Sequence, residues 1–135
     1  MYVTKLITYE VALTDETVAS TGHVDTDVFT TEDGEYFTVK VKVEGTNPSI
    51  RMIEYTTDSE EDLDTDIPES SWSYTDSYGN EIDIGNPTIT TKDKWLKTNY
   101  NPYLDGRTKI RVQGNAGNGD DTVVNLRVIK QRREY

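Results

Sequence analysis

Apolar and polar side chains alternate along much of this 135-residue chain, and this period of two restricts its fold more than any other feature. In the run YFTVKVKV, the apolar Phe37, Val39 and Val41 fall on one side of an extended backbone, and the threonine and lysines between them fall on the other. Such alternation is typical of a β-strand that buries one face and exposes the other. We therefore expect sheets that are each apolar on one face.

Further segments share this alternation, or the β-branched and aromatic composition that strands favour. They are residues 5–13, 17–20, 24–29, 50–53, 72–75, 81–84, 88–91, 109–112 and 124–128. Glycine, proline, asparagine and aspartate occur between them, as turns require, and only the segment 91–98 is compatible with a helical turn. The sequence predicts one all-β domain over residues 1–135, an antiparallel, jelly-roll-like β-sandwich of about eight to ten strands.

A glycine-rich stretch, QGNAGNGDD, lies between two of the expected strands and contains Gly114, Gly117 and Gly119. A phosphate-binding loop places its glycines between a strand and a helix, so that the amides at the start of the helix face the phosphate. Here the residues that follow, TVVNLRV, have the pattern of a second strand. We therefore predict a hairpin turn at this point and no nucleotide site.

The segment 57–71 carries seven acidic residues and is expected to form a long exposed loop. Asp62, Asp64 and Asp66 alternate within it, and clustered carboxylate oxygens are the ligands that calcium prefers. An EF-hand loop would require glycine where Ile67 stands, so that motif is absent. Calcium at these three aspartates remains an alternative to a purely solvated loop, and no other cofactor is expected.

His23 is the only histidine, and the chain contains no cysteine. A disulfide framework and a thiolate zinc site are therefore impossible. No nucleophile motif accompanies His23, since the glycines that flank a hydrolase serine are missing. We expect His23 to be a surface residue, and we do not expect an enzyme.

Exposed aromatic side chains are the main alternative signal, because a carbohydrate-binding module stacks sugars on such a platform. The candidates are Trp72, Tyr74, Tyr78, Trp95, Tyr100 and Tyr103. Both tryptophans are equally compatible with packing in or over the core, as this residue type commonly does. A carbohydrate-binding module, assisted by calcium or not, stays open as a second function.

The net charge of −11, from 25 acidic and 14 basic residues, disfavours binding to the phosphates of nucleic acids. The one local basic cluster is the tail at residues 130–135, with Lys130, Arg132 and Arg133. No apolar run approaches the roughly 18 residues of a membrane span, and the first residues do not have the pattern of a signal peptide. We expect neither a nucleic acid nor a membrane as partner.

The order of these features resembles that of small all-β structural proteins of tailed bacteriophage particles. The stretches that carry the resemblance are LITYEVALTDETVASTG, FTVKVKVEGTNPSIRMIEYTTD, SSWSYTDSYGNEIDI and KIRVQGNAGNGDDTVVNLRVI. In such proteins one strand pair often follows the pattern V-x-V-x-G-T-x-P-S-I, which residues 41–50 match. The final hairpin often begins I-R-V-x-G, which residues 110–114 match. The resemblance covers about residues 5–129.

The resemblance implies a non-enzymatic structural protein of the virion, made in the host cytoplasm and working through protein–protein contacts. Decoration or stabilisation of the capsid is the first expectation, and a head–tail adaptor or tail component is the alternative. The expected partners are other virion proteins such as the major capsid protein, together with further copies of the chain in a symmetric homo-oligomer, for which a trimer is our hypothesis. Arg132, Arg133 and Tyr135 in the terminal arm are the candidate interface residues.

Overall fold

Eight strands make up the regular structure of the computed structural model, which describes residues 3–31, 35–57, 72–74, 78, 80–85, 88–100, 106–115 and 120–134. The strands are β1 (Val3–Val18), β2 (His23–Asp25), β3 (Phe29–Thr31), β4 (Glu35–Glu44), β5 (Ile50–Thr57), β6 (Leu96–Tyr100), β7 (Gly106–Gly114) and β8 (Thr122–Glu134). No helix in this described part of the chain is long and apolar enough to cross a membrane.

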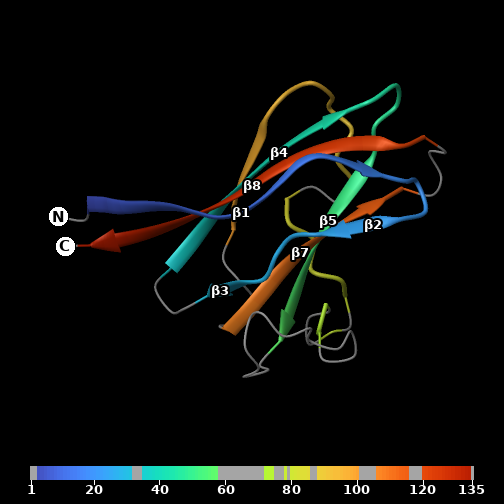
Figure 1. The fold of residues 1–135 in the computed structure, drawn as a ribbon. Helices are drawn as coiled ribbons and strands as arrows, with labels where there is room; N and C mark the ends of the chain where they lie inside the picture. The colour runs from blue at the N-terminus through green and yellow to red at the C-terminus, as the bar shows by residue number, and fades with distance from the viewer. Residues whose placement is uncertain are drawn as a thin grey trace.

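The strands form two antiparallel four-stranded sheets that pack face to face (Figure 1), which confirms the predicted β-sandwich. Sheet A has the order β1-β8-β4-β6. In sheet B, β5 pairs with β7 along its whole length, so the short strands β2 and β3 lie one after the other along the opposite edge of β7. Isolated bridges at Ser73, Asp83 and Ile89 then cover the outer edge of β5.

None of these strands pairs with its neighbour in the chain. Every connection crosses from one sheet to the other except β2–β3, and these two strands both pair with β7. This interleaving is the strand order of a jelly roll. The hairpin predicted at the glycine-rich stretch is therefore wrong, because this stretch joins β7 to β8 across the sandwich. Residues 45–49 likewise join β4 to β5 across the sandwich, so the two strands matched by the pattern at residues 41–50 do not pair. Turn residues permit a reversal of the chain, but they do not decide whether it stays within one sheet.

Gly114, at the end of β7, has a packing role and does not form a hairpin turn. A Cβ atom at this position would overlap the carbonyl oxygen of Ala19, in the connection between β1 and β2. The amide of Gly114 also donates a hydrogen bond of 2.9 Å to the carbonyl oxygen of Gly22. The glycine thus permits two backbones to come close together. Residues 116–119, which include Gly117 and Gly119, lie outside the described part of the chain.

The core lies between the sheets and uses the side chains that the alternation placed inward. Phe37, Val39, Val41 and Val43 of β4 are all at most 2% exposed. They pack with inward residues of β5, β7 and β8, and those residues are Ile50, Met52, Ile110, Val112, Val124, Leu126 and Val128. Burial of each such side chain contributes about 1.5–3 kcal/mol to stability. The period of two therefore predicted the core correctly.

Some element boundaries differ from the prediction. Residues 5–13 and 17–18 belong to a single strand, β1, whose pairing with β8 has three irregularities, and residues 19–20 lie in the connection to β2. The region 91–98 contains no helical turn, because residues from Leu96 onward pair with β4 as strand β6. The segments predicted as strands at 72–75, 81–84 and 88–91 contribute only isolated bridges in their described residues.

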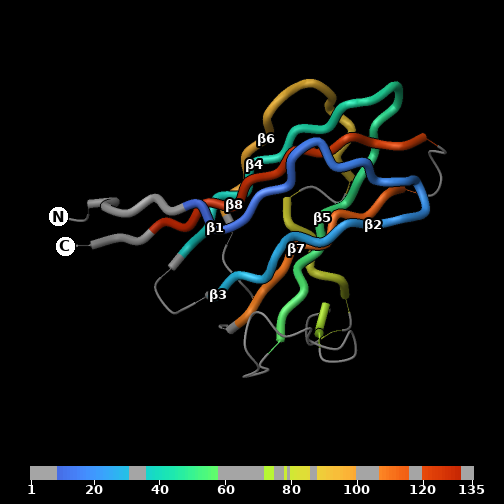
Figure 2. Tube along the Cα trace, viewed as in Figure 1, coloured from blue at the N-terminus to red at the C-terminus, as the bar shows by residue number. Residues whose placement is uncertain are grey.

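The two ends of the described chain run together as a ribbon. Val3 of β1 pairs with Glu134 of β8, so the tail residues 130–134 continue a strand. β1 and β8 lie side by side in the ribbon (Figure 1) and in the tube trace (Figure 2). The acidic segment begins at the end of β5, and its residues 58–71 lie outside the described part.

Candidate functional site

A row of three positively charged residues crosses the outer face of sheet A. Lys40 at the centre of β4 lies opposite Arg127 of β8 on one side and opposite Lys97 of β6 on the other. Directly opposed residues in antiparallel strands project from the same face, and the neighbours of Lys40, Val39 and Val41, point into the core. We call Lys40, Lys97 and Arg127 the cationic row. Lys97 and Arg127 are exposed, and Lys40 is half-buried.

Trp95 lies beside this row. The backbone amide of Asp93 donates a hydrogen bond of 2.9 Å to the carbonyl oxygen of Val43, which anchors the turn before β6 to the end of β4. The side chain of Trp95 is 39% exposed. Arg127 Cζ lies 4.9 Å from the centroid of its ring, and Lys42 Nζ lies 5.5 Å from it. Both distances are within the range of cation–π attraction.

The cationic row, Lys42 and Trp95 together form what we call the Trp95 face. Lys42 has a carboxylate partner, since its Nζ lies 3.2 Å from Glu44 Oε1. Among the described residues, no ion pair or hydrogen bond involves the side chain of Lys40, Lys97 or Arg127. Like charges directly opposite each other in a sheet are destabilising. A protein of net charge −11 therefore presents a local positive surface whose central row has no carboxylate partner in the part of the chain that the structure describes.

The outer face of sheet B shows the opposite arrangement. Lys109 and Arg111 of β7 share the carboxylate of Asp25, on β2: Lys109 Nζ donates to Oδ2 at 2.8 Å, and Arg111 binds both oxygens at 2.8 and 3.0 Å. Burial alone would raise the pKa of Asp25, but the hydrogen bonds and positive charges of Arg111 and Lys109 outweigh it and lower that pKa. Arg51 is similarly paired with Asp83 at 2.9 Å and Glu81 at 3.3 Å.

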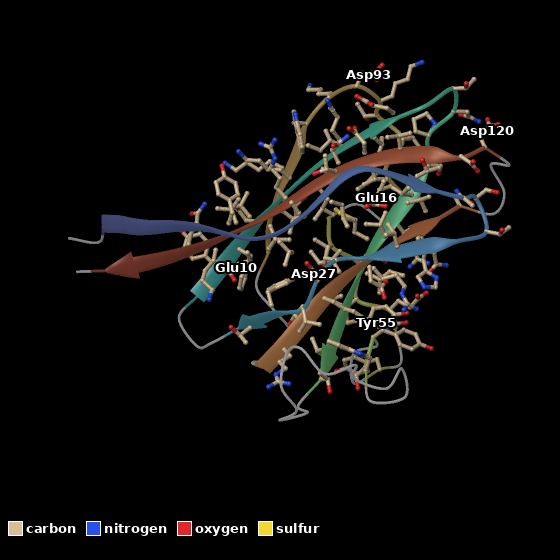
Figure 3. All side chains as sticks on the ribbon, in the orientation of Figure 1. Glu10, Glu16, Asp27, Tyr55, Asp93 and Asp120 are labelled. Carbon is tan, nitrogen blue, oxygen red and sulfur yellow. The ribbon has the colours of Figure 1, made fainter. Side chains whose placement is uncertain are left out.

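Aromatic residues complete this second face. Lys109 Nζ lies 4.8 Å from the ring centroid of Trp72, and Arg111 donates a hydrogen bond of 3.1 Å to the hydroxyl of Tyr55. Tyr74 stacks on Tyr55 with 5.1 Å between ring centroids. Trp72 and Tyr55 are only 7% and 6% exposed, so this cluster of aromatic and charged side chains is a packed structural unit and not an open binding surface. In Figure 3, Tyr55 lies on the opposite side of the sandwich from Asp93, in the turn before Trp95.

The two tryptophans thus lie on opposite outer faces, so no single sugar platform can use both. The ring of Trp95 has cations over it, and Trp72 is buried. Of the other aromatic candidates, Tyr78 is 88% exposed and Tyr74 is 43% exposed. The side chains of Tyr100 and Tyr103 lie outside the described part of the structure.

His23 is exposed on β2, where its backbone pairs with that of Gln113. Its ring forms no hydrogen bond to any described residue, so no described group orients it for proton transfer.

The metal candidates Asp62, Asp64 and Asp66 fall outside the described residues. Elsewhere in the described ranges, no group of three potential ligands converges. The calcium hypothesis therefore stays a prediction.

The predicted interface residues lie at the far end of the β1–β8 ribbon. The backbone of Arg132 pairs with Leu6 and that of Arg133 with Thr4, whereas Tyr135 is outside the described range. The sequence alone did not predict the cationic row, because its three residues lie on three different strands. The sequence shows only that each occupies a polar position in an alternating or adjacent run.

No protein-family model matches this chain, and no curated protein matches it significantly.

Proposed function

We propose that the protein is a non-enzymatic structural protein of a bacteriophage particle, and that it decorates or stabilises the capsid by binding the major capsid protein. Two features support this proposal. The sequence resembles small all-β phage structural proteins, and the jelly roll is an architecture that viral capsid domains use widely.

The single observation that carries the proposal is the Trp95 face. Sheet A presents three cations that have no carboxylate partner in the described part of the chain, next to an exposed tryptophan, and such a surface is suited to binding another protein. Many copies on one particle gain avidity, so a modest affinity at each contact is sufficient. A symmetric homo-oligomer, specifically a trimer, is part of the proposal, since closed assemblies are symmetric.

The test begins with the genes that flank this one, which identify the particle to purify. We expect mass spectrometry to find the protein in purified virions, and electron microscopy of tagged virions to place it on the capsid shell. Label at the neck or the tail would instead assign it to the head–tail adaptor or to the tail. Absence of the protein from purified virions would refute the proposal.

A carbohydrate-binding module is the second candidate, because lectin domains also use jelly rolls and because the side chains of Tyr78 and Tyr74 are exposed. A glycan array, run with and without a calcium chelator, tests it. Sugar binding that is lost on Tyr78→Ala or Tyr74→Ala would support this function over the first.

A further inference from the structure

We propose that the Trp95 face is the docking surface for a carboxylate-rich surface on a partner protein. The inference deepens the proposed function and rests on it, since it names the chemistry of the partner. The occupant is a group of aspartate and glutamate side chains that enters opposite Lys40, Lys97 and Arg127.

The geometry of the sheet fixes the spacing of the charges. Neighbouring strands lie about 4.8 Å apart, so the three cationic residues of the row start within about 10 Å of each other. The screening length in physiological salt is about 8 Å, so their mutual repulsion is only partly screened. Carboxylates presented at strand-like spacing would relieve that repulsion, and this gain is available only on binding.

A shortage of acidic residues does not explain the unpaired row, because the chain has 25 acids for 14 bases. On sheet B, the carboxylate of Asp25 forms ion pairs with both Lys109 and Arg111, which lie two residues apart on the outer face of β7. Within the described residues, Lys109 and Arg111 on one outer face are thus paired with a carboxylate, whereas Lys40, Lys97 and Arg127 on the other have no such partner. This contrast marks the Trp95 face as the surface shaped for an external anion.

Trp95 favours a protein partner over a nucleic acid. Tryptophan and arginine are enriched among the residues that dominate protein–protein binding energy, and Arg127 lies against the Trp95 ring. The net charge of −11 repels a long polyanion at a distance. A protein partner presents its carboxylates in a compact cluster. The attraction between that cluster and the Trp95 face then outweighs the repulsion from the net charge.

The first probe is a synthetic oligoglutamate peptide, with an oligoglutamine peptide of equal length as control. The chain has two tryptophans, so the variant Trp72→Phe leaves Trp95 as the only indole reporter. We expect saturable quenching or enhancement of its fluorescence by oligoglutamate only, with affinity falling as salt rises. Titration calorimetry on the unaltered chain gives the same measurement if Trp72→Phe does not fold.

Substitutions in the row test where the peptide binds. Lys40→Gln should weaken oligoglutamate binding about three- to fivefold, and Lys40→Gln with Lys97→Gln about tenfold, because each exposed charge contact contributes modestly. Arg51→Gln is the matched control: it removes one positive charge from the opposite face and should leave the affinity unchanged.

Three results would overturn the inference. The first is the absence of oligoglutamate binding, and the second is equal weakening of that binding by Lys40→Gln and Arg51→Gln. The third is tighter binding of a DNA oligonucleotide than of oligoglutamate, which would assign the face to nucleic acid. The proposed function fails separately, if the protein binds oligoglutamate through this face but is absent from purified virions. A protein that is present in virions and attaches equally well with Lys40→Gln and Lys97→Gln would defeat the inference alone.

Discussion

Reversal of the charge at the centre of the cationic row should stabilise the isolated protein. Lys40 faces Arg127 and Lys97 in two cross-strand pairs, and Lys40→Glu converts both pairs from repulsive to attractive. Cross-strand charge pairs contribute about 0.2–1 kcal/mol each. Loss of two repulsions and gain of two attractions therefore raises the free energy of unfolding by about 1–2 kcal/mol. For a domain of this size the melting temperature should rise by about 4–8 °C.

Thermal and urea denaturation, followed by circular dichroism at low ionic strength, measure this effect. Lys40→Gln should give about half of the gain, because it removes the repulsions and adds no attraction. Lys94→Glu is the control for net charge: Lys94 is exposed, lies outside the strands and has no ion-pair partner among the described residues. In about 1 M salt, where the screening length is about 3 Å, the difference between Lys40→Glu and Lys94→Glu should shrink.

A stability of Lys40→Glu equal to that of Lys94→Glu at low salt would refute this reasoning, since it would mean that the three cations do not repel one another. If the gain appears together with loss of oligoglutamate binding, the row costs the free protein stability and is retained for binding. Trade-offs of this kind between stability and function are common at binding sites.

Other substitutions test the rest of the fold. Asp25→Asn should lower the free energy of unfolding by about 2–3 kcal/mol in urea titrations, because Lys109 and Arg111 lose a half-buried carboxylate partner. A loss below about 0.5 kcal/mol would contradict this. The pKa of Asp25 is lower in the folded than in the unfolded protein, so its stabilising effect is present above the ordinary value of 3.8 and is lost as the pH falls below it. The unaltered protein should accordingly lose stability more steeply than Asp25→Asn in that acidic range, and parallel pH profiles would argue against the pairing. Gly114→Ala should cost about 2–4 kcal/mol through backbone overlap, whereas Gly22→Ala, which has an ordinary contact distance of 3.4 Å, should cost about 1 kcal/mol or less.

The local pattern of the sequence determined which side of each strand is buried. The alternation in β4 predicted that Phe37 and Val39 point inward and that Lys40 and Lys42 point outward, and the structure confirms the buried set. This succeeds because successive side chains of an extended strand must point to opposite faces, whatever the strand pairs with. The all-β fold follows from the same repeat.

Only the tertiary structure decided which strands are neighbours. The glycine-rich stretch after β7 looked like a hairpin because glycine and asparagine permit a tight reversal, yet β7 and β8 lie in different sheets. The candidate site depends wholly on this choice, because Lys40, Lys97 and Arg127 become a row only through the registers of β4 with β6 and β8. Strand register is set by the packing of the entire core, and residues so far apart in the chain carry no local signal of their meeting.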